Sequence, residues 1–222
     1  MPQMILAERQ SAGRGRQGKS FFSPPGAGVY LSFAFACERG TDALLLTTSA
    51  AVAAHLAIRR ATGISCGIKW VNDRYVEDRK VAGILAESLF LGEKRYVILG
   101  IGVNLYPSEL PMELRDIAGS LLPGRAGLRN ALAAELCCSL ARLAKDPCPE
   151  GFMEIYRANS LVLGKDVVYW ENGERHEGVA RSIDERGRLL VRKTDGEESL
   201  LGSGEITLRW RSSEEKKRRT ES

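Results

Sequence analysis

The run MILAERQSAGRGRQGKSFFSPPGAGVYLSFAFA, residues 4–36, sets two apolar segments on either side of a polar loop. The flanking segments, 3–8 and 29–36, are rich in branched and aromatic residues, so we expect two strands, both buried. The loop includes GRGRQGKS, residues 13–20, with three glycines, three cations and no apolar side chain. This loop cannot contribute to a core, so the question is what it binds.

The loop formally matches the phosphate-binding pattern GxxxxGK[ST] through Gly13, Gly18, Lys19 and Ser20. That pattern should run directly into a helix, whereas FFSPPGAG follows here, and its prolines break any helix. We therefore interpret the match as coincidental. Glycine amides and arginine guanidinium groups still suit an anion, and a solvated hairpin loop is the alternative.

Length and composition indicate a soluble globular protein. The chain has 222 residues, of which 44% are hydrophobic and 27% charged, enough to bury a core without a disulfide or metal. The net charge of +4 is small, so we expect no nucleic-acid partner. Five cysteines without a CxxC pair and two distant histidines argue against a disulfide framework and a zinc site. No apolar run matches a membrane span or signal peptide, so we expect no membrane partner and a cytoplasmic location.

Hydrophobic periodicity predicts three helices and several strands. We expect a helix over 42–60, capped by Thr41 or Asp42 and followed by Gly63. Leucines at helical spacing predict an amphipathic helix over 128–143, and a shorter helix covers 150–160. Strands are expected at 67–73 and 94–106, with a hairpin over 74–90 whose return strand is broken at Gly83. The segment 107–127 is rich in proline and glycine and is expected to be a loop.

The pattern of the sequence changes near Leu163. Beyond it, short strands alternate with ENGE, DERG and TDGE turns, which predicts a small antiparallel barrel. We therefore expect an α+β fold in which a mixed or antiparallel sheet packs on one helical layer, over residues 1–162. The barrel domain follows over 163–211, and a disordered tail over 212–222.

Three further stretches carry candidate functional residues: KWVND at 69–73, DRKVAGIL at 78–85 and GIGVN at 100–104. Each has an ordinary alternative. Lys69 and Lys80 could be solvated turn lysines, Asn72 and Asp73 turn formers, and Asn104 a strand-end cap. Taken singly, none of these stretches decides between the two interpretations.

Taken together and in order, the stretches resemble a known family. ERQSAGRGRQGKSFFSPPGAGVYLS, KWVNDRYVEDRKVAGILAES and VILGIGVNL are similar to the catalytic domain of biotin protein ligases, and GKDVVYW with GSGEITLR resembles that family's C-terminal barrel. The resemblance covers roughly residues 5–210. It implies a biotin/lipoate ligase fold related to class II aminoacyl-tRNA synthetases, followed by an SH3-like barrel. It also implies an ATP-dependent ligase that forms biotinyl-5′-AMP and transfers biotin to a lysine of a biotin carboxyl carrier domain, without a DNA-binding repressor domain.

The resemblance also implies residue roles. Arg16 and Lys80 match the catalytic cations where the biotin carboxylate meets the α-phosphate. The expected cofactors are ATP, biotin and Mg²⁺, which would arrive with ATP near Asp73 because no side-chain cluster forms a metal site. Positions matching contacts to biotin or its adenylate are Gln10, Gly13, Arg14, Gly15, Arg16, Lys80, Gly83 and Ile84. Positions matching nucleotide contacts are Lys69, Trp70, Asn72, Asp73 and Asn104.

The chain departs from the family pattern at its start. Family members have an earlier strand, a Ser-Thr-Asn-type segment and a helix before the AERQ strand, and we expect this chain to lack that unit. A late recorded start, a fragment or a degenerate relative would each explain it. Val71 also stands where proline is usual. The alternative functions are a lipoate or octanoate ligase, and a non-catalytic protein that binds the adenylate or the carrier domain. A homodimer formed through a sheet edge is a further expectation.

Overall fold

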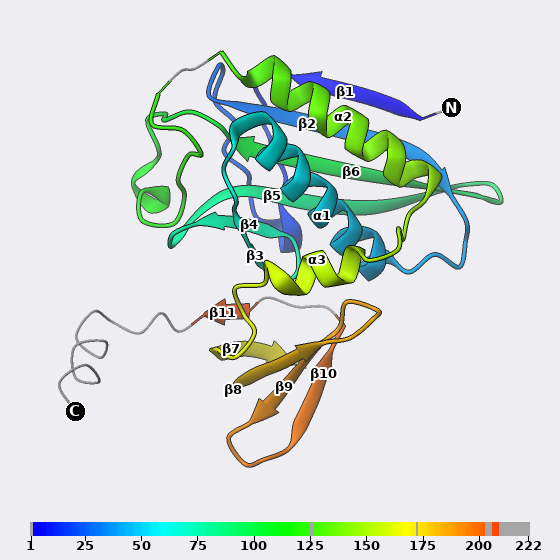
Figure 1. The fold of residues 1–222 in the computed structure, drawn as a ribbon, viewed down its shortest axis with the longest axis vertical. Coiled ribbons are helices and arrows are strands. Elements are labelled where there is room, and N and C mark those ends of the chain that lie inside the picture. The colour runs from blue at the N-terminus through cyan, green and yellow to red at the C-terminus, as the bar shows by residue number, and fades with distance from the viewer. Residues whose placement is uncertain (1, 125–126, 172, 203–205, 209–222) are drawn as a thin grey trace. The chain divides into compact units, whose positions relative to one another are not determined.

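The computed structural model describes residues 2–124, 127–171, 173–202 and 206–208 (Figure 1). The chain divides into two compact units, Met1–Ser160 and Leu161–Ser222. The tail predicted over 212–222 lies outside the described residues. Among the described residues, no helix is both long and apolar enough to cross a bilayer.

The first unit is built on a six-stranded antiparallel sheet. The strands are β1 (Gln3–Ala7), β2 (Gly28–Cys37), β3 (Gly67–Lys69), β4 (Asp73–Val76), β5 (Arg79–Leu91) and β6 (Lys94–Asn104). Their order in the sheet is β1-β2-β6-β5-β4-β3. Residues of β6 alternate between buried and partly exposed, as expected for a central strand with one face on the core. The predicted α+β class is confirmed.

Helices α1 (Ala43–Thr62) and α2 (Arg129–Lys145) lie side by side across one face of the sheet, and α3 (Phe152–Ala158) follows (Figure 1). The predicted ends of α1 are confirmed. The Asp42 carboxylate accepts a hydrogen bond from the Leu44 amide at 2.7 Å, and Gly63 ends the helix in the left-handed conformation with φ 75°. The predicted loop at 107–127 contains only a one-turn 3₁₀ helix, η2 (Met112–Leu114), among its described residues.

Two expectations about the strands are wrong. β1 was expected to be buried, but Ile5 and Leu6 are 68% and 52% exposed. The reason is position, because within the described residues β1 pairs only with β2 and forms the sheet edge. The return strand of the hairpin is not broken at Gly83, which pairs in register with Asp73 on one side and Gly102 on the other. The irregularity falls on β4 instead.

The second unit is a five-stranded antiparallel sheet. Its strands are β7 (Asp166–Glu171), β8 (Glu174–Ile183), β9 (Leu189–Lys193), β10 (Glu198–Leu201) and β11 (Ile206–Leu208). Their order is β10-β9-β8-β7-β11, so within the described residues the sheet is open, with β10 and β11 at its edges. The predicted short strands and the DERG and TDGE turns are confirmed, whereas the ENGE turn includes residue 172, which lies outside the described residues, and closure into a barrel is not shown.

Candidate active site

The glycine-rich loop leaves β1, folds back on itself and returns to β2. Its base is closed by Gln10 and Ser23: the Gln10 amide donates to the Ser23 carbonyl at 3.1 Å, and the Ser23 hydroxyl donates to Gln10 Oε1 at 2.7 Å. At the tip, the Gly15 amide donates to the Lys19 carbonyl at 2.6 Å. Between them lies a short 3₁₀ turn, η1 (Arg16–Gly18), and no helix follows before β2. The GxxxxGK[ST] match is therefore not a Walker-type loop.

Gly13 lies where the two arms of the loop pack against each other. Its carbonyl accepts a hydrogen bond from the Phe21 amide at 2.9 Å. A Cβ at this position would overlap the Phe21 carbonyl oxygen and lie 2.9 Å from Gln10 Oε1 and 3.0 Å from Ser23 Oγ. No side chain fits there without opening the base, so the arms require glycine at 13.

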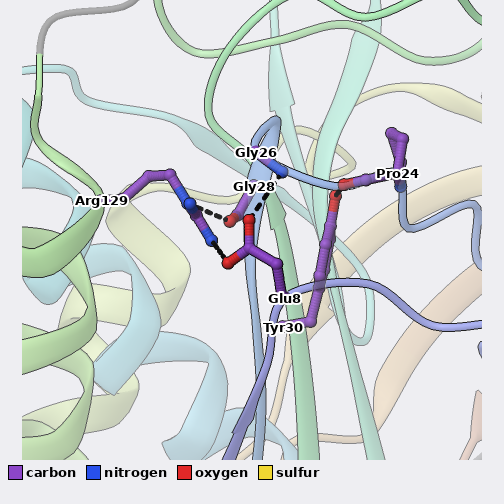
Figure 2. A network of polar contacts seen from close by, with 6 residues as sticks. All are labelled: Glu8, Pro24, Gly26, Gly28, Tyr30 and Arg129. Atoms are coloured by element: carbon purple, nitrogen blue, oxygen red, sulfur yellow. Dashed lines mark hydrogen bonds and ion pairs between the residues drawn. The ribbon is translucent and has the colours of Figure 1, made fainter.

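A buttress outside the loop ties its two ends to α2 (Figure 2). Arg129, the first residue of α2, donates from Nη2 to Glu8 Oε2 at 2.6 Å and from Nε to the Gly28 carbonyl at 3.0 Å. Glu8 Oε1 accepts from the Gly26 amide at 3.1 Å. The hydrogen bond with Arg129 is the main reason that the pKa of Glu8 is below its ordinary value. The segment that precedes the loop and the one that follows it are thus held by one ion pair.

Tyr30 and Gly102 seat the end of the loop on the central sheet. The Tyr30 hydroxyl donates to the Pro24 carbonyl at 2.9 Å (Figure 2), and burial raises the pKa of Tyr30 to about 12. The Phe21 ring meets the Tyr30 ring edge-on, with centroids 6.4 Å apart. A Cβ on Gly102 would lie 2.6 Å from Phe21 Cζ, so the second glycine of GIGVN makes room for this ring. The sequence singled out the GIGVN stretch, but it did not indicate Phe21 as the group that packs against its second glycine.

The tip of the loop reaches the KWVND stretch through Arg16. Arg16 Nη1 donates to Asn72 Oδ1 at 3.0 Å, and Asn72 Nδ2 donates to the Ile84 carbonyl on β5 at 2.8 Å. Asn72 is buried, with 8% of its surface exposed, so these partners fix its amide. Three predicted site residues from three separate stretches therefore share one hydrogen-bonded chain.

Lys80 and Asp73 form an ion pair beside this chain. The distance from Lys80 Nζ to Asp73 Oδ1 is 2.7 Å, and the two side chains are 28% and 21% exposed. A Cβ on Gly83 would lie 3.2 Å from Lys80 Cε, so this glycine leaves space for the lysine side chain to cross the strand. The Lys80 backbone is held on both sides, because its amide donates to the Ile117 carbonyl at 2.8 Å and its carbonyl accepts from the Gly119 amide at 2.9 Å.

The remaining predicted residues lie in other surroundings. Arg14 points out of the loop, 73% exposed, with Nη2 3.2 Å from Glu87 Oε2. Lys69 Nζ lies 5.5 Å from the centre of the Tyr75 ring, and Trp70 is buried in the core. Asn104 ends β6 opposite Gly28. The structure thus joins Arg16, Asn72, Asp73, Lys80, Gly83 and Ile84 by direct contact, and Lys69 lies next to this cluster because it pairs with Asp73 across β3 and β4.

The cluster combines two cations, an amide and a carboxylate under a glycine-rich loop. Both cations are partly exposed, so a ligand can reach them. Guanidinium and ammonium groups at such a position favour an anionic ligand or a reaction in which negative charge develops. Within the described residues, no group of three or more His, Cys, Asp and Glu side chains is placed to hold a metal ion.

Comparison with known proteins gives consistent matches. The model of the biotin/lipoate A/B protein ligase family matches residues 1–104. The chain is 31% identical over 220 residues to the bifunctional ligase/repressor BirA of Escherichia coli, covering 92% of this chain but 65% of that protein, just under two thirds. It is 32% identical over 220 residues to the biotin--[acetyl-CoA-carboxylase] ligase of Mycobacterium tuberculosis, covering 91% of this chain and 77% of the relative.

The fold is also similar to a solved structure. The biotin protein ligase of Aquifex aeolicus, in complex with biotin and ATP, superposes with a TM-score of 0.75 at 27% identity. The match covers 93% of this chain and 88% of that one. The likeness therefore extends over both sheets described above.

Proposed function

The chain belongs to the biotin protein ligase family, and on that premise we propose that it is an ATP-dependent biotin–protein ligase. In the first step a carboxylate oxygen of biotin attacks the α-phosphorus of ATP, which gives biotinyl-5′-AMP and releases pyrophosphate. In the second, the uncharged ε-amine of a lysine on a carrier domain attacks the acyl carbon. The amide forms, AMP leaves with the electron pair of the broken acyl–oxygen bond, and the amine proton passes to solvent.

The observation that carries this proposal is the cluster that Arg16 of the loop forms with Asn72, Asp73 and Lys80. The first step brings two anions together, so the protein has to offset their repulsion and stabilise the charge on the pentacovalent phosphorus. Lys80 and Arg16 are the two cations of this cluster. Asn72 holds the guanidinium of Arg16, and Asp73 holds the ammonium of Lys80. Because both side chains are already held, each cation loses less conformational freedom when the substrates bind.

The other family positions complete the proposed site. Gln10, Gly13, Arg14, Gly15, Gly83 and Ile84 would contact biotin or its adenylate, and Lys69, Trp70 and Asn104 the nucleotide. The amide-lined, cationic loop supports this assignment, because it can cover an acyl phosphate and exclude water from the reactive anhydride. Because Trp70 is buried, it would support the nucleotide site from the core side.

Magnesium would arrive with the triphosphate. Mg²⁺ is commonly bound by one or two carboxylates together with substrate phosphates, and the donor set here offers the single carboxylate of Asp73. The residues fit an ion of that kind, which would screen the phosphate charge. They do not form a resident metal site among the described residues.

A sheet edge supports docking of the carrier domain. β4 pairs with β5 only over Arg79–Gly83, so residues 85–91 of β5 have no neighbouring strand on that side within the described chain. Leu89, Phe90 and Leu91 are 46%, 57% and 59% exposed there. Glu87, on the same stretch, pairs with Arg14 of the loop. A strand of the carrier domain added to this edge would lie beside the loop, and a second copy of the chain could use the same edge as a homodimer.

The remaining expectations complete the proposal. We assign residues 1–162 to the ligase domain and 163–211 to a C-terminal domain whose five-stranded sheet would close as an SH3-like barrel. We also propose that the protein acts in the cytoplasm, on an acetyl-CoA carboxylase of the kind that the names of two relatives state.

The direct test is to incubate the protein with biotin, MgATP and a biotin carboxyl carrier domain. Pyrophosphate release and biotin on the carrier lysine are expected, and parallel reactions with lipoate and octanoate should give neither product. Lys80→Ala should abolish pyrophosphate release, whereas Arg9→Ala, which removes an exposed cation at the start of the loop, should not change it.

Other outcomes would replace the proposal. Transfer of lipoate or octanoate in preference to biotin would make the chain a ligase for those acids. Tight binding of biotinyl-5′-AMP with no pyrophosphate release would make it a non-catalytic relative.

A further inference from the structure

Arg74 follows Asp73 on β4 and is completely buried, with 0% of its surface exposed. Its Nη1 donates to the Asp73 carbonyl at 3.0 Å. Its Nε and Nη2 have no hydrogen-bond partner among the described residues. A guanidinium group that is desolvated and only partly bonded is a costly feature, so its presence calls for an explanation.

The groups packed around Arg74 do not neutralise it. His55 of α1 is fully buried, its Nδ1 lies 3.0 Å from the Cys66 carbonyl, and burial lowers its pKa, which keeps the ring uncharged. Burial raises the pKa of the Cys66 thiol and of the Tyr156 hydroxyl, so neither carries negative charge near neutral pH. The carboxyl group that interacts with Arg74 is that of Asp73.

Asp73 therefore has a cation on each side. In front, Lys80 Nζ lies 2.7 Å from Oδ1. Behind, Arg74 is bonded to the Asp73 backbone and attracted by its carboxylate. Without Arg74, the ion pair of Asp73 and Lys80 would be close to neutral overall. Charges act over longer distances in a buried region than in water, so the buried cation changes the potential felt by a ligand at Lys80.

We propose that Arg74 is a positioning residue for adenylate formation: a buried cation that offsets the charge of Asp73, so that the Asp73–Lys80 pair presents net positive charge to the anionic substrates. This inference rests on the proposed function. Arg74 does not reach the substrates itself, because it lies wholly inside the protein and acts through Asp73.

The test exploits opposite effects on stability and activity. Arg74→Met removes the charge and two unpartnered nitrogens, so the melting temperature should stay the same or rise. The value of kcat/KM for ATP in pyrophosphate release should fall about tenfold. Arg74→Lys, which keeps the charge, should restore most of that loss.

Arg95 provides a matched control. It is also a buried arginine, 7% exposed, but its guanidinium donates to Ser88 Oγ and to the carbonyls of Arg39 and Thr41. Arg95→Met should therefore lower the melting temperature and leave kcat/KM for ATP unchanged. A purely structural role for Arg74 would make the two methionine variants behave alike.

Two outcomes would overturn the inference. One is an Arg74→Met variant with a lower melting temperature and unchanged kcat/KM, and the other is equal loss of activity in the methionine and lysine variants. If the wild type releases no pyrophosphate, the proposed function has failed instead. In that case the affinity for ATP is measured by calorimetry, and the inference stands only if Arg74→Met binds ATP more weakly than the wild type.

Discussion

Replacing Gly13 by alanine should open the base of the glycine-rich loop without unfolding the domain. The new methyl group would overlap the Phe21 carbonyl oxygen and press on Gln10 Oε1 and Ser23 Oγ, 2.9 and 3.0 Å away. Those last two side chains are bonded to each other at 2.7 Å, so neither can turn aside without breaking that bond. The Phe21 carbonyl oxygen belongs to the backbone, so it cannot move away without separating the two arms.

The expected magnitude follows from the bonds that separation breaks. The Phe21 amide to Gly13 carbonyl bond and the Ser23 to Gln10 bond are lost together. At about 1 kcal/mol each, they amount to about 2 kcal/mol, roughly a 30-fold increase in the open population of the loop. The helices and central strands are untouched, so the melting temperature of the domain should change little.

Limited trypsin digestion measures this opening without relying on any activity, because the loop carries Arg14, Arg16 and Lys19. The rate of cleavage within residues 14–19 should rise by about the same factor in Gly13→Ala, provided that opening is fast compared with cleavage. Gly40→Ala is the matched control, since a Cβ there meets nothing within 4 Å. An unchanged cleavage rate in Gly13→Ala would refute the close packing of the two arms.

Three further predictions concern the sheet and the buttress of the loop. Gly28→Ala should lower the free energy of unfolding by about 1–3 kcal/mol, and the melting temperature with it, because its Cβ would overlap the Val103 carbonyl on the central strand. The pKa of Tyr30 is about 12 in the folded state and 10 ordinarily, so the unfolded state loses its proton first as the pH rises. The free energy of unfolding, measured by urea titration, should therefore fall between pH 10 and pH 12, and it should fall less steeply in Tyr30→Phe. Arg129→Met should free Glu8 and speed trypsin cleavage of the loop, while Arg9→Ala should not.

Elements whose ends depend on local chemistry could be predicted from the sequence. The helix over 42–60 is the clearest case, since Asp42 and Gly63 act within one turn of its ends. The exposure of β1 could not be predicted, because MILA has the same apolar composition at the edge of a sheet as at its centre. Only the pairing of strands distant in sequence separates those cases, and in the part of the chain that the structure describes β1 has β2 as its one neighbouring strand.

The residues of the candidate site could be predicted from the order of the motifs along the chain. The contacts between them could not. The sequence indicated Arg16, Asn72, Asp73 and Lys80, and the fold brings them together. The burial of Arg74 had no local signal, because a charged residue between two strand residues is usually solvated. Its environment includes His55 of α1, Tyr156 of α3 and Cys66 before β3, and only the tertiary fold brings these side chains around it.

The loop's hydrogen bonds divide it into a fixed base and an exchangeable tip. The base is closed by the hydrogen bonds between Gln10 and Ser23, with Phe21 bonded to Gly13 beside them, and Arg129 buttresses it, so its arms are already in place before a ligand binds. At the tip, Arg16 donates to the neutral amide oxygen of Asn72, which is a weaker acceptor than a phosphate oxygen. Asn72 keeps its position without Arg16, because its Nδ2 is bonded to the Ile84 carbonyl. An anion can therefore replace Asn72 Oδ1 as an acceptor for the guanidinium of Arg16, without the entropic cost of ordering a free loop.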